Sequence, residues 1–144
     1  MRLTRFTDLA LRVLLLAASD NGRLITIEET AEALAVSRAH LKKVVLLLAR
    51  EGYLESRRGR SGGFALARAP AEINLGALVR RTEPDFALVE CYLPDHACNL
   101  LHACALPPVL GKATRAFLDV LDAHSLEDVR RGPVRLGTRA AAAG

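Results

Sequence analysis

The first part of the chain has hydrophobic positions with a helical period. Apolar side chains recur there at steps of three and four, at Phe6, Leu9, Ala10, Val13, Leu14 and Ala17. This spacing predicts an amphipathic helix with one buried face. The same stretch resembles a signal peptide in its arginines and apolar run. Because Asp8 and Arg12 interrupt the run, we interpret it as a folded helix of a cytoplasmic protein. A membrane span is not predicted, since the chain contains no stretch of about 18 residues without a charge.

Two short helices are predicted after a loop at Asp20–Gly22. Thr26 and Glu29 have the spacing of a capping box, which begins a helix that we expect to run through Ala35. Ser37 then has the position of an N-cap, and the helix after it has an apolar stripe at Leu41, Val44, Val45 and Leu48. Gly52 favours a left-handed stop. The pattern predicts a helix-turn-helix.

A glycine-rich hairpin follows, with alternating positions from 53 to 67 around a tip that carries Arg57, Arg58 and Arg60. A helix-turn-helix with such a hairpin is a winged helix, in which the second helix enters the major groove of DNA. The candidate DNA contacts on and before that helix are Ser37, Arg38, His40, Lys42 and Lys43. Arg2 and Arg12 of the first helix and the three wing arginines complete the set.

Fewer helices are predicted in the second half of the chain. Asn74 has the position of an N-cap for a helix to about Arg81, and a longer helix runs from about Pro108 to His124. The apolar stripe of that helix, at Leu110, Ala113, Phe117, Val120 and Leu121, is too large for a small domain to cover, which predicts a homodimer. A last short helical turn is predicted at Ser125–Asp128.

These elements define a mainly α fold class with a small β-wing. We expect a winged-helix DNA-binding domain at 1–70, a cysteine loop with a dimerisation helix at 71–128, and a flexible tail at 129–144.

The distribution of charge supports this division. Residues 1–72 contain 12 Lys or Arg and 8 Asp or Glu, whereas residues 73–144 contain 8 of each. A basic first half is typical of a module that binds a polyanion such as double-stranded DNA. Since only 4% of the residues are aromatic and Trp is absent, stacking on single strands is not expected.

All three cysteines of the chain lie within one segment, at Cys91, Cys98 and Cys104. Their spacing matches neither the close pairs of zinc ribbons nor a redox CxxC motif. Residues 82–111 contain no Lys or Arg. The segment favours metal or cluster ligation, with His96 and His102 as possible fourth ligands, over three buried thiols or a thiol–disulfide switch.

Several stretches carry a more specific resemblance. They are Met1–Asp8, Ser37–Val45, Arg58–Gly63, Glu72–Gly76, Arg81–Phe86 and Val89–Cys91. Together they resemble the IscR/NsrR family of winged-helix iron–sulfur regulators over roughly residues 1–128. IscR-like members have a histidine three residues after the last cysteine. Here that position is Pro107, which favours the nitric-oxide-sensing branch of the family, whose members are repressors.

The resemblance implies an iron–sulfur cluster held by the three cysteines, with Asp8 of the partner subunit at the remaining site. It further implies an inverted-repeat operator and nitric oxide as the signal. A [4Fe–4S] cluster is favoured over [2Fe–2S] because a single oxygen ligand serves the one open corner of a cubane. A thiol–disulfide repressor and an iron–sulfur-status regulator stay open as alternatives. No enzyme is expected, since the chain has no nucleophile–base set or phosphate loop.

Overall fold

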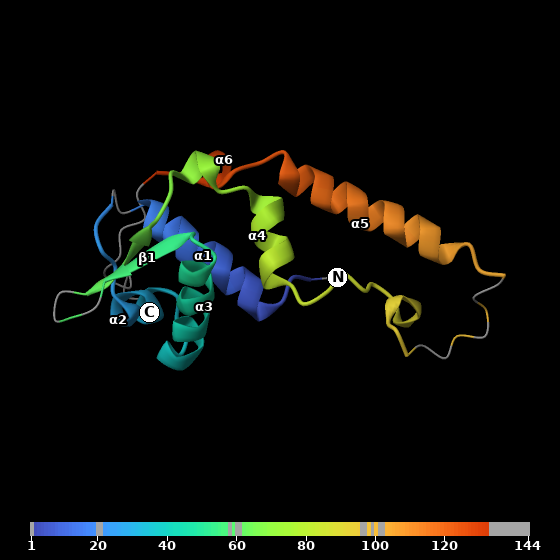
Figure 1. Cartoon of the computed structure of the whole chain (residues 1–144), viewed down its shortest axis with the longest axis horizontal. Coiled ribbons are helices and arrows are strands. Elements are labelled where there is room, and N and C mark those ends of the chain that lie inside the picture. The colour runs from blue at the N-terminus through green and yellow to red at the C-terminus, as the bar shows by residue number, and fades with distance from the viewer. Residues whose placement is uncertain are drawn as a thin grey trace, which may run out of the picture.

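A computed structural model of the chain describes residues 2–19, 22–57, 59, 62–95, 98, 100 and 103–132. The fold is mainly α-helical with one two-stranded antiparallel sheet, which confirms the predicted fold class (Figure 1). The elements in chain order are α1 Arg5–Ser19, α2 Ile27–Ala33, α3 Arg38–Arg50, β1 Leu54–Arg57, β2 Gly63–Leu66, the 3₁₀ helix η1 Pro70–Glu72, α4 Leu75–Thr82, the 3₁₀ helix η2 Glu90–Tyr92, α5 Leu106–Asp122 and α6 Leu126–Val129.

Helix α1 forms the centre of the hydrophobic core. Ala10, Val13 and Leu14 are fully buried, as the periodicity predicts, and α1 packs against α3, β2 and α4. Ile73 and Leu126, from the second half of the sequence, belong to the same buried cluster. The core therefore includes residues from both halves of the chain.

The helix-turn-helix has the predicted caps. Thr26 accepts a hydrogen bond from the Glu29 amide, and the Glu29 carboxylate accepts one from the Thr26 amide, which forms the capping box. Helix α2 ends at Ala33, two residues before the predicted end at Ala35. The cause is a left-handed turn: Ala35 has φ +52°, and the Val36 amide donates to the Ala31 carbonyl, as in a Schellman motif.

The wing is built on the core. Strand β1 pairs with β2 in the register Leu54↔Leu66 to Arg57↔Gly63. Ile25 adds a third, isolated pairing, because Ile25 and Phe64 exchange two backbone hydrogen bonds of 2.9 Å. This approach requires glycine at position 63, where a Cβ would lie 2.7 Å from the Ile25 carbonyl oxygen. The base of the wing is thus held against the segment that precedes α2.

Helix α5 extends away from this core (Figure 1). It begins at Leu106 and ends at Asp122, each two residues earlier than predicted. The early start is possible because amides in the first turn of a helix have no acceptor within the helix, so the prolines at 107 and 108 lose no hydrogen bond there. The chain then returns to the core: the Leu126 amide donates to the Ile73 carbonyl, and Arg130 donates to the Ala18 carbonyl at the end of α1. Among the described residues, none of the helices has the length and apolar character needed to cross a bilayer.

Candidate DNA-binding surface and metal centre

The first turns of α3 present a basic surface. Ser37 caps the helix by accepting a hydrogen bond from the His40 amide at 3.3 Å. Arg38, Lys42 and Lys43 are exposed, and Arg38 has one distant acidic neighbour, Glu28, at 3.7 Å. These cations are therefore available to a polyanion.

His40 is the one partly buried member of this set. Its ring lies 6.4 Å from that of Phe6 between centroids, at an interplanar angle of 40°. Phe6 belongs to α1, so this contact joins the first turn of α1 to the first turn of α3. A displacement of α1 would reach the candidate recognition helix through these two rings.

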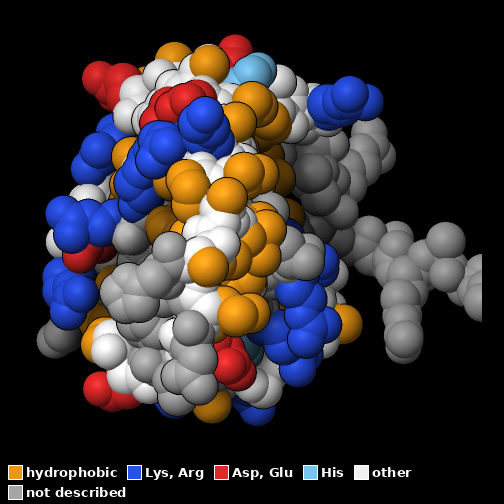
Figure 2. Space-filling model, turned by 90° about the vertical axis from the view of Figure 1, so that its right-hand side faces the viewer, with side chains coloured by type: hydrophobic (Ala, Val, Ile, Leu, Met, Phe, Trp, Pro, Cys, Tyr) orange, Lys and Arg blue, Asp and Glu red, His pale blue; other side chains and the backbone are white. Residues whose placement is uncertain are grey.

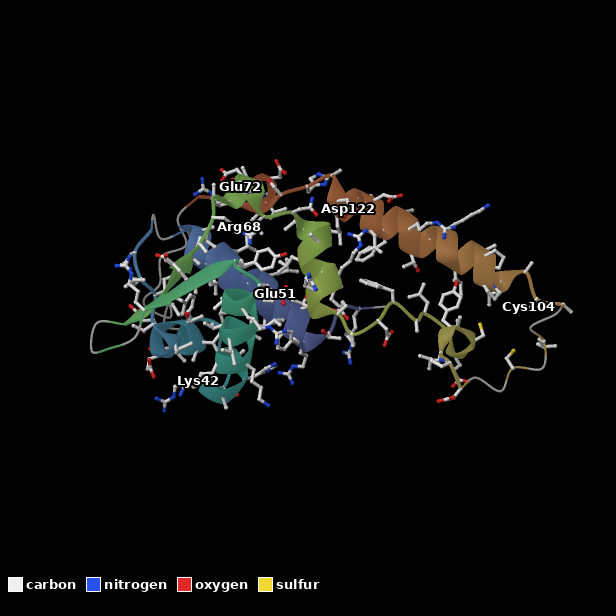
Figure 3. The ribbon with its side chains drawn as sticks, in the orientation of Figure 1. Lys42, Glu51, Arg68, Glu72, Cys104 and Asp122 are labelled. Carbon is white, nitrogen blue, oxygen red and sulfur yellow. The ribbon has the colours of Figure 1, made fainter. Side chains whose placement is uncertain are left out.

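The other candidate DNA contacts are partly described. Arg57 is exposed at the end of β1, with Glu55 3.8 Å away, and Arg2 is exposed before α1. Arg58 and Arg60 lie outside the described residues. Arg12 is exposed on α1, but its guanidinium is paired with Asp8. Lys42 and the cysteine loop, marked by Cys104, lie at opposite ends of the molecule (Figure 3).

The three cysteines lie at different depths. Cys91 in η2 and Cys104 just before α5 are partly buried, Cys98 is exposed, and all three are free thiols. His96 and His102 lie outside the described residues. Within the part of the chain that is described, no three Cys, His, Asp or Glu side chains converge on one point. Among the described residues, the three cysteines and Asp8 of one chain therefore do not form a single ligand group.

Asp8 is exposed on the first part of α1. One of its oxygens accepts a hydrogen bond from Arg12 Nε at 3.1 Å, and the other lies 3.0 Å from the second guanidinium nitrogen. The pairing matches the i,i+4 ion pair that the sequence indicates. The Asp8 side chain is about half exposed.

The donor set suits a soft metal or an iron–sulfur cluster. Cysteine thiolates are the ligands that such groups prefer, and three of them lie in one segment. Residues 82–111 contain no Lys or Arg whose charge would pair with a thiolate in place of a metal. The residues present therefore fit the group that the sequence predicts.

A hydrogen bond closes the cysteine loop. The Tyr92 hydroxyl donates to the Pro107 carbonyl at 2.5 Å, across 15 positions of sequence. Tyr92 follows Cys91, and Pro107 lies just beyond Cys104. Sequence reasoning did not single out this pair, since a side chain to backbone contact across a loop leaves no periodic signal.

A second long-range contact joins the loop to α1. Glu83 Oε1 accepts hydrogen bonds from the Thr4 amide at 2.7 Å and from the Thr4 hydroxyl at 3.0 Å. Thr4 in turn accepts from the Thr7 amide at the start of α1. The segment that leads to Cys91 is thus attached to the N-terminus of the helix that carries Asp8. The separation of 79 residues explains why local patterns did not reveal it.

The end of α5 is fixed to α4. Arg80 contacts both carboxylate oxygens of Asp122, at 2.7 Å for one pair, and Asn74 donates to the Asp122 carbonyl. Gly76 lies beneath this pair, and a side chain there would overlap the Asp122 carboxylate. The hydrogen bond from Arg80 lowers the pKa of the Asp122 carboxyl below its ordinary value. This α4–α5 junction sets the direction in which α5 leaves the core.

Helix α5 has no buried residue within this chain. Leu106, Val109 and Val120 are exposed, at 52%, 60% and 61%. Figure 2 looks onto the end of the molecule that contains the cysteine loop and the start of α5, and shows hydrophobic side chains in a band with basic side chains on its flanks. An apolar face of this kind is typical of a protein–protein interface.

Comparisons with known proteins point to one class of transcriptional regulators. The sequence profile of the Rrf2 family, described as iron-dependent transcriptional regulators, matches residues 3–132. The chain is 45% identical to the HTH-type transcriptional regulator NsrR of Bacillus licheniformis over 131 residues, which cover 90% of this chain and 92% of that protein. It is 47% identical to the regulator of the same name from Geobacillus kaustophilus over 131 residues, 90% of this chain and 89% of that protein.

Among solved structures, the fold is similar to that of the oxidized form of Staphylococcus aureus CymR. The TM-score is 0.72 at 24% sequence identity, and the match covers 94% of this chain and 100% of that chain.

Proposed function

Because this chain belongs to the Rrf2 family of iron-dependent transcriptional regulators, we propose that it is a homodimeric, cytoplasmic repressor that senses nitric oxide through an iron–sulfur cluster. The chain is a transcriptional regulator and not an enzyme. The observation that carries the proposal is the set of three free thiols in a segment without Lys or Arg, on a winged helix. The identity with regulators named NsrR supports the branch.

The proposed DNA surface consists of α3 and the wing. Arg38, Lys42 and Lys43 would meet base edges and phosphates in the major groove, and Arg57 would meet the backbone beside it. A two-fold dimer would bind an inverted repeat with half-site centres one or two turns, about 10 or 20 bp, apart.

The proposed ligands are Cys91, Cys98 and Cys104, with Asp8 of the partner subunit at the remaining site. A [4Fe–4S] cluster, favoured over [2Fe–2S], supplies iron to which the small neutral molecule nitric oxide binds. Carboxylate oxygen is a harder ligand for iron than thiolate, which makes the Asp8 site the most easily exchanged. Ligation by both chains would join the cysteine loop of one subunit to α1 of the other.

The chain's own contacts provide a route from this site to DNA. Asp8 lies on α1, and the Phe6 ring on the same helix contacts His40 of α3. When Asp8 is held by the partner's loop, α1 and therefore α3 are fixed in one position relative to the other subunit. When Asp8 is released, that constraint is absent, and the spacing of the two α3 helices is free to change. This difference is the coupling between signal and operator affinity.

Anaerobic purification tests the proposal most directly. The protein should be brown, with iron and sulfide in equal amounts near four per chain for [4Fe–4S], and nitric oxide should bleach it and weaken operator binding in the same titration. Cys98→Ala should remove the colour. A colourless protein that loses operator binding on mild oxidation would instead support the thiol–disulfide repressor, and a coloured protein indifferent to nitric oxide would support the iron–sulfur-status regulator.

A further inference from the structure

We propose that Tyr92 is a positioning residue for the metal centre, which holds the two ends of the cysteine loop together before any metal binds. The inference rests on the proposed function, since it assigns a role at the same site. Its basis is the hydrogen bond from the Tyr92 hydroxyl to the Pro107 carbonyl. We name this hydrogen bond the loop tether.

The loop tether lies beside two of the three thiols. Cys91 is the neighbour of Tyr92 within η2, whose turn is closed by the hydrogen bond from the Leu93 amide to the Glu90 carbonyl. Cys104 stands three residues before Pro107, directly ahead of α5. A single bond therefore connects the short helix that carries one ligand to the long helix that follows another.

The phenol of Tyr92 lies against the beginning of α5. A Cβ at Gly111, in the second turn, would lie at an ordinary contact distance of 3.5 Å from the Tyr92 hydroxyl oxygen. Tyr92 is partly buried there, at the end of a helix that has no buried residue of its own. Among the helices and strands, α5 packs chiefly against α4, and the loop tether connects its first turn to η2.

The physical benefit is preorganisation. A flexible loop loses conformational entropy when a metal brings its ends together, and a contact that already holds the ends reduces that cost at binding. The effect should be as large as one net hydrogen bond, which corresponds to a change in metal affinity of about three- to tenfold. Tyr92 does not touch the metal in this scheme and acts only through Cys91 and Cys104.

Tyr92→Phe tests the role, because it removes the hydroxyl and keeps the ring. In anaerobic titrations of the metal-free protein with Co²⁺, followed by the thiolate-to-metal absorption, the variant should bind about three- to tenfold more weakly than the wild type. The loaded variant should lose its visible absorption to a chelator faster by a similar factor. Operator affinity of the metal-free protein should not change, since Tyr92 lies outside α3 and the wing.

Tyr53→Phe is the matched control, since Tyr53 is the only other tyrosine and lies beside α3 under the Arg68 guanidinium. Equal weakening in both variants, or a Tyr92→Phe protein that binds Co²⁺ like the wild type, would overturn the inference.

A cluster-independent measurement separates this inference from the proposed function. In a Cys98→Ser background, a short bis-maleimide should join Cys91 and Cys104 of one chain about three- to tenfold faster with tyrosine at position 92 than after Tyr92→Phe. Failure of the wild type to take up iron, with this difference in rate retained, would reject the cluster and keep the loop tether. Equal rates would reject the loop tether, whatever the wild type binds.

Discussion

Asp8 and Arg12 form a two-point ion pair on the exposed side of α1, with contacts of 3.1 and 3.0 Å. Both side chains are about half exposed, so the pair stabilises the helix by only about 0.3–0.5 kcal/mol. An interaction this weak does not prevent the carboxylate from exchanging its partner. In the proposed homodimer, iron held by the partner's loop would compete with Arg12 for this carboxylate.

Asp8→Ala should therefore preserve a cluster on the three cysteines but change its spectrum and its effect on DNA. The remaining iron site would take solvent, and α1 would no longer be connected to the partner's loop. Operator affinity should become nearly the same with and without nitric oxide, as measured by fluorescence anisotropy under anaerobic conditions. Arg12→Ala is the control, and it should retain the wild-type spectrum. An Asp8→Ala protein with an unchanged spectrum and response would show that the carboxylate serves only the helix.

Arg38 and Arg57 should differ in how they contribute to DNA binding. Arg38→Ala removes a cation from the first turn of α3, and we expect a loss of about 1–3 kcal/mol on the operator with little change on random DNA. Arg57→Ala should weaken both DNAs alike and reduce the slope of log K against log[salt] by about one. Salt titrations on the two DNAs measure both effects. An equal loss of specificity in the two variants would contradict this assignment.

Gly76→Ala should destabilise the α4–α5 junction. The new methyl group would overlap the Asp122 carboxylate and separate it from Arg80, so we expect a loss of about 1–3 kcal/mol in the free energy of unfolding by urea. Asp122→Ala in the same chain should relieve the overlap, and the double variant should then lose less than the sum of the two single changes. Gly111→Ala is the matched control on α5, because its methyl group would make only an ordinary 3.5 Å contact.

The same junction should respond to acid. Since Arg80 lowers the pKa of Asp122 in the folded chain, the pair contributes stability that is complete above the ordinary carboxyl pKa of about 4 and is lost as the pH falls through the lowered value. Asp122→Asn should be less stable than the wild type at neutral pH and equally stable in strong acid. Urea unfolding across this pH range measures the difference. A difference that persists in strong acid would exclude the ion pair as its source.

The parts of the structure that the sequence predicts well are governed by short spacings. The capping box at Thr26, the N-cap at Ser37 and the left-handed Gly52, at φ +72°, each depend on residues within one turn. The end of α2 was misjudged because Ala35 adopts a left-handed conformation that alanine rarely takes. The pattern contained no glycine to mark it.

The candidate site was predictable in its residue types and not in its connections. Three cysteines in a segment without Lys or Arg indicate a metal centre, yet Thr4–Glu83, Tyr92–Pro107 and Arg80–Asp122 join residues far apart in sequence. Such contacts depend on where α4 and α5 lie relative to α1, which local propensity does not encode. The spacing of the cysteines also does not reveal whether they converge, and among the described residues of one chain no three possible ligands come together.

The pairing of Ile25 with Phe64 has a consequence for how the wing moves. Both residues are almost completely buried, so their amides should exchange with deuterium only when the core itself opens. The base of the wing then belongs to the slowest-exchanging part of the molecule. We therefore expect the angle between the base of the wing and α3 to stay the same when DNA binds.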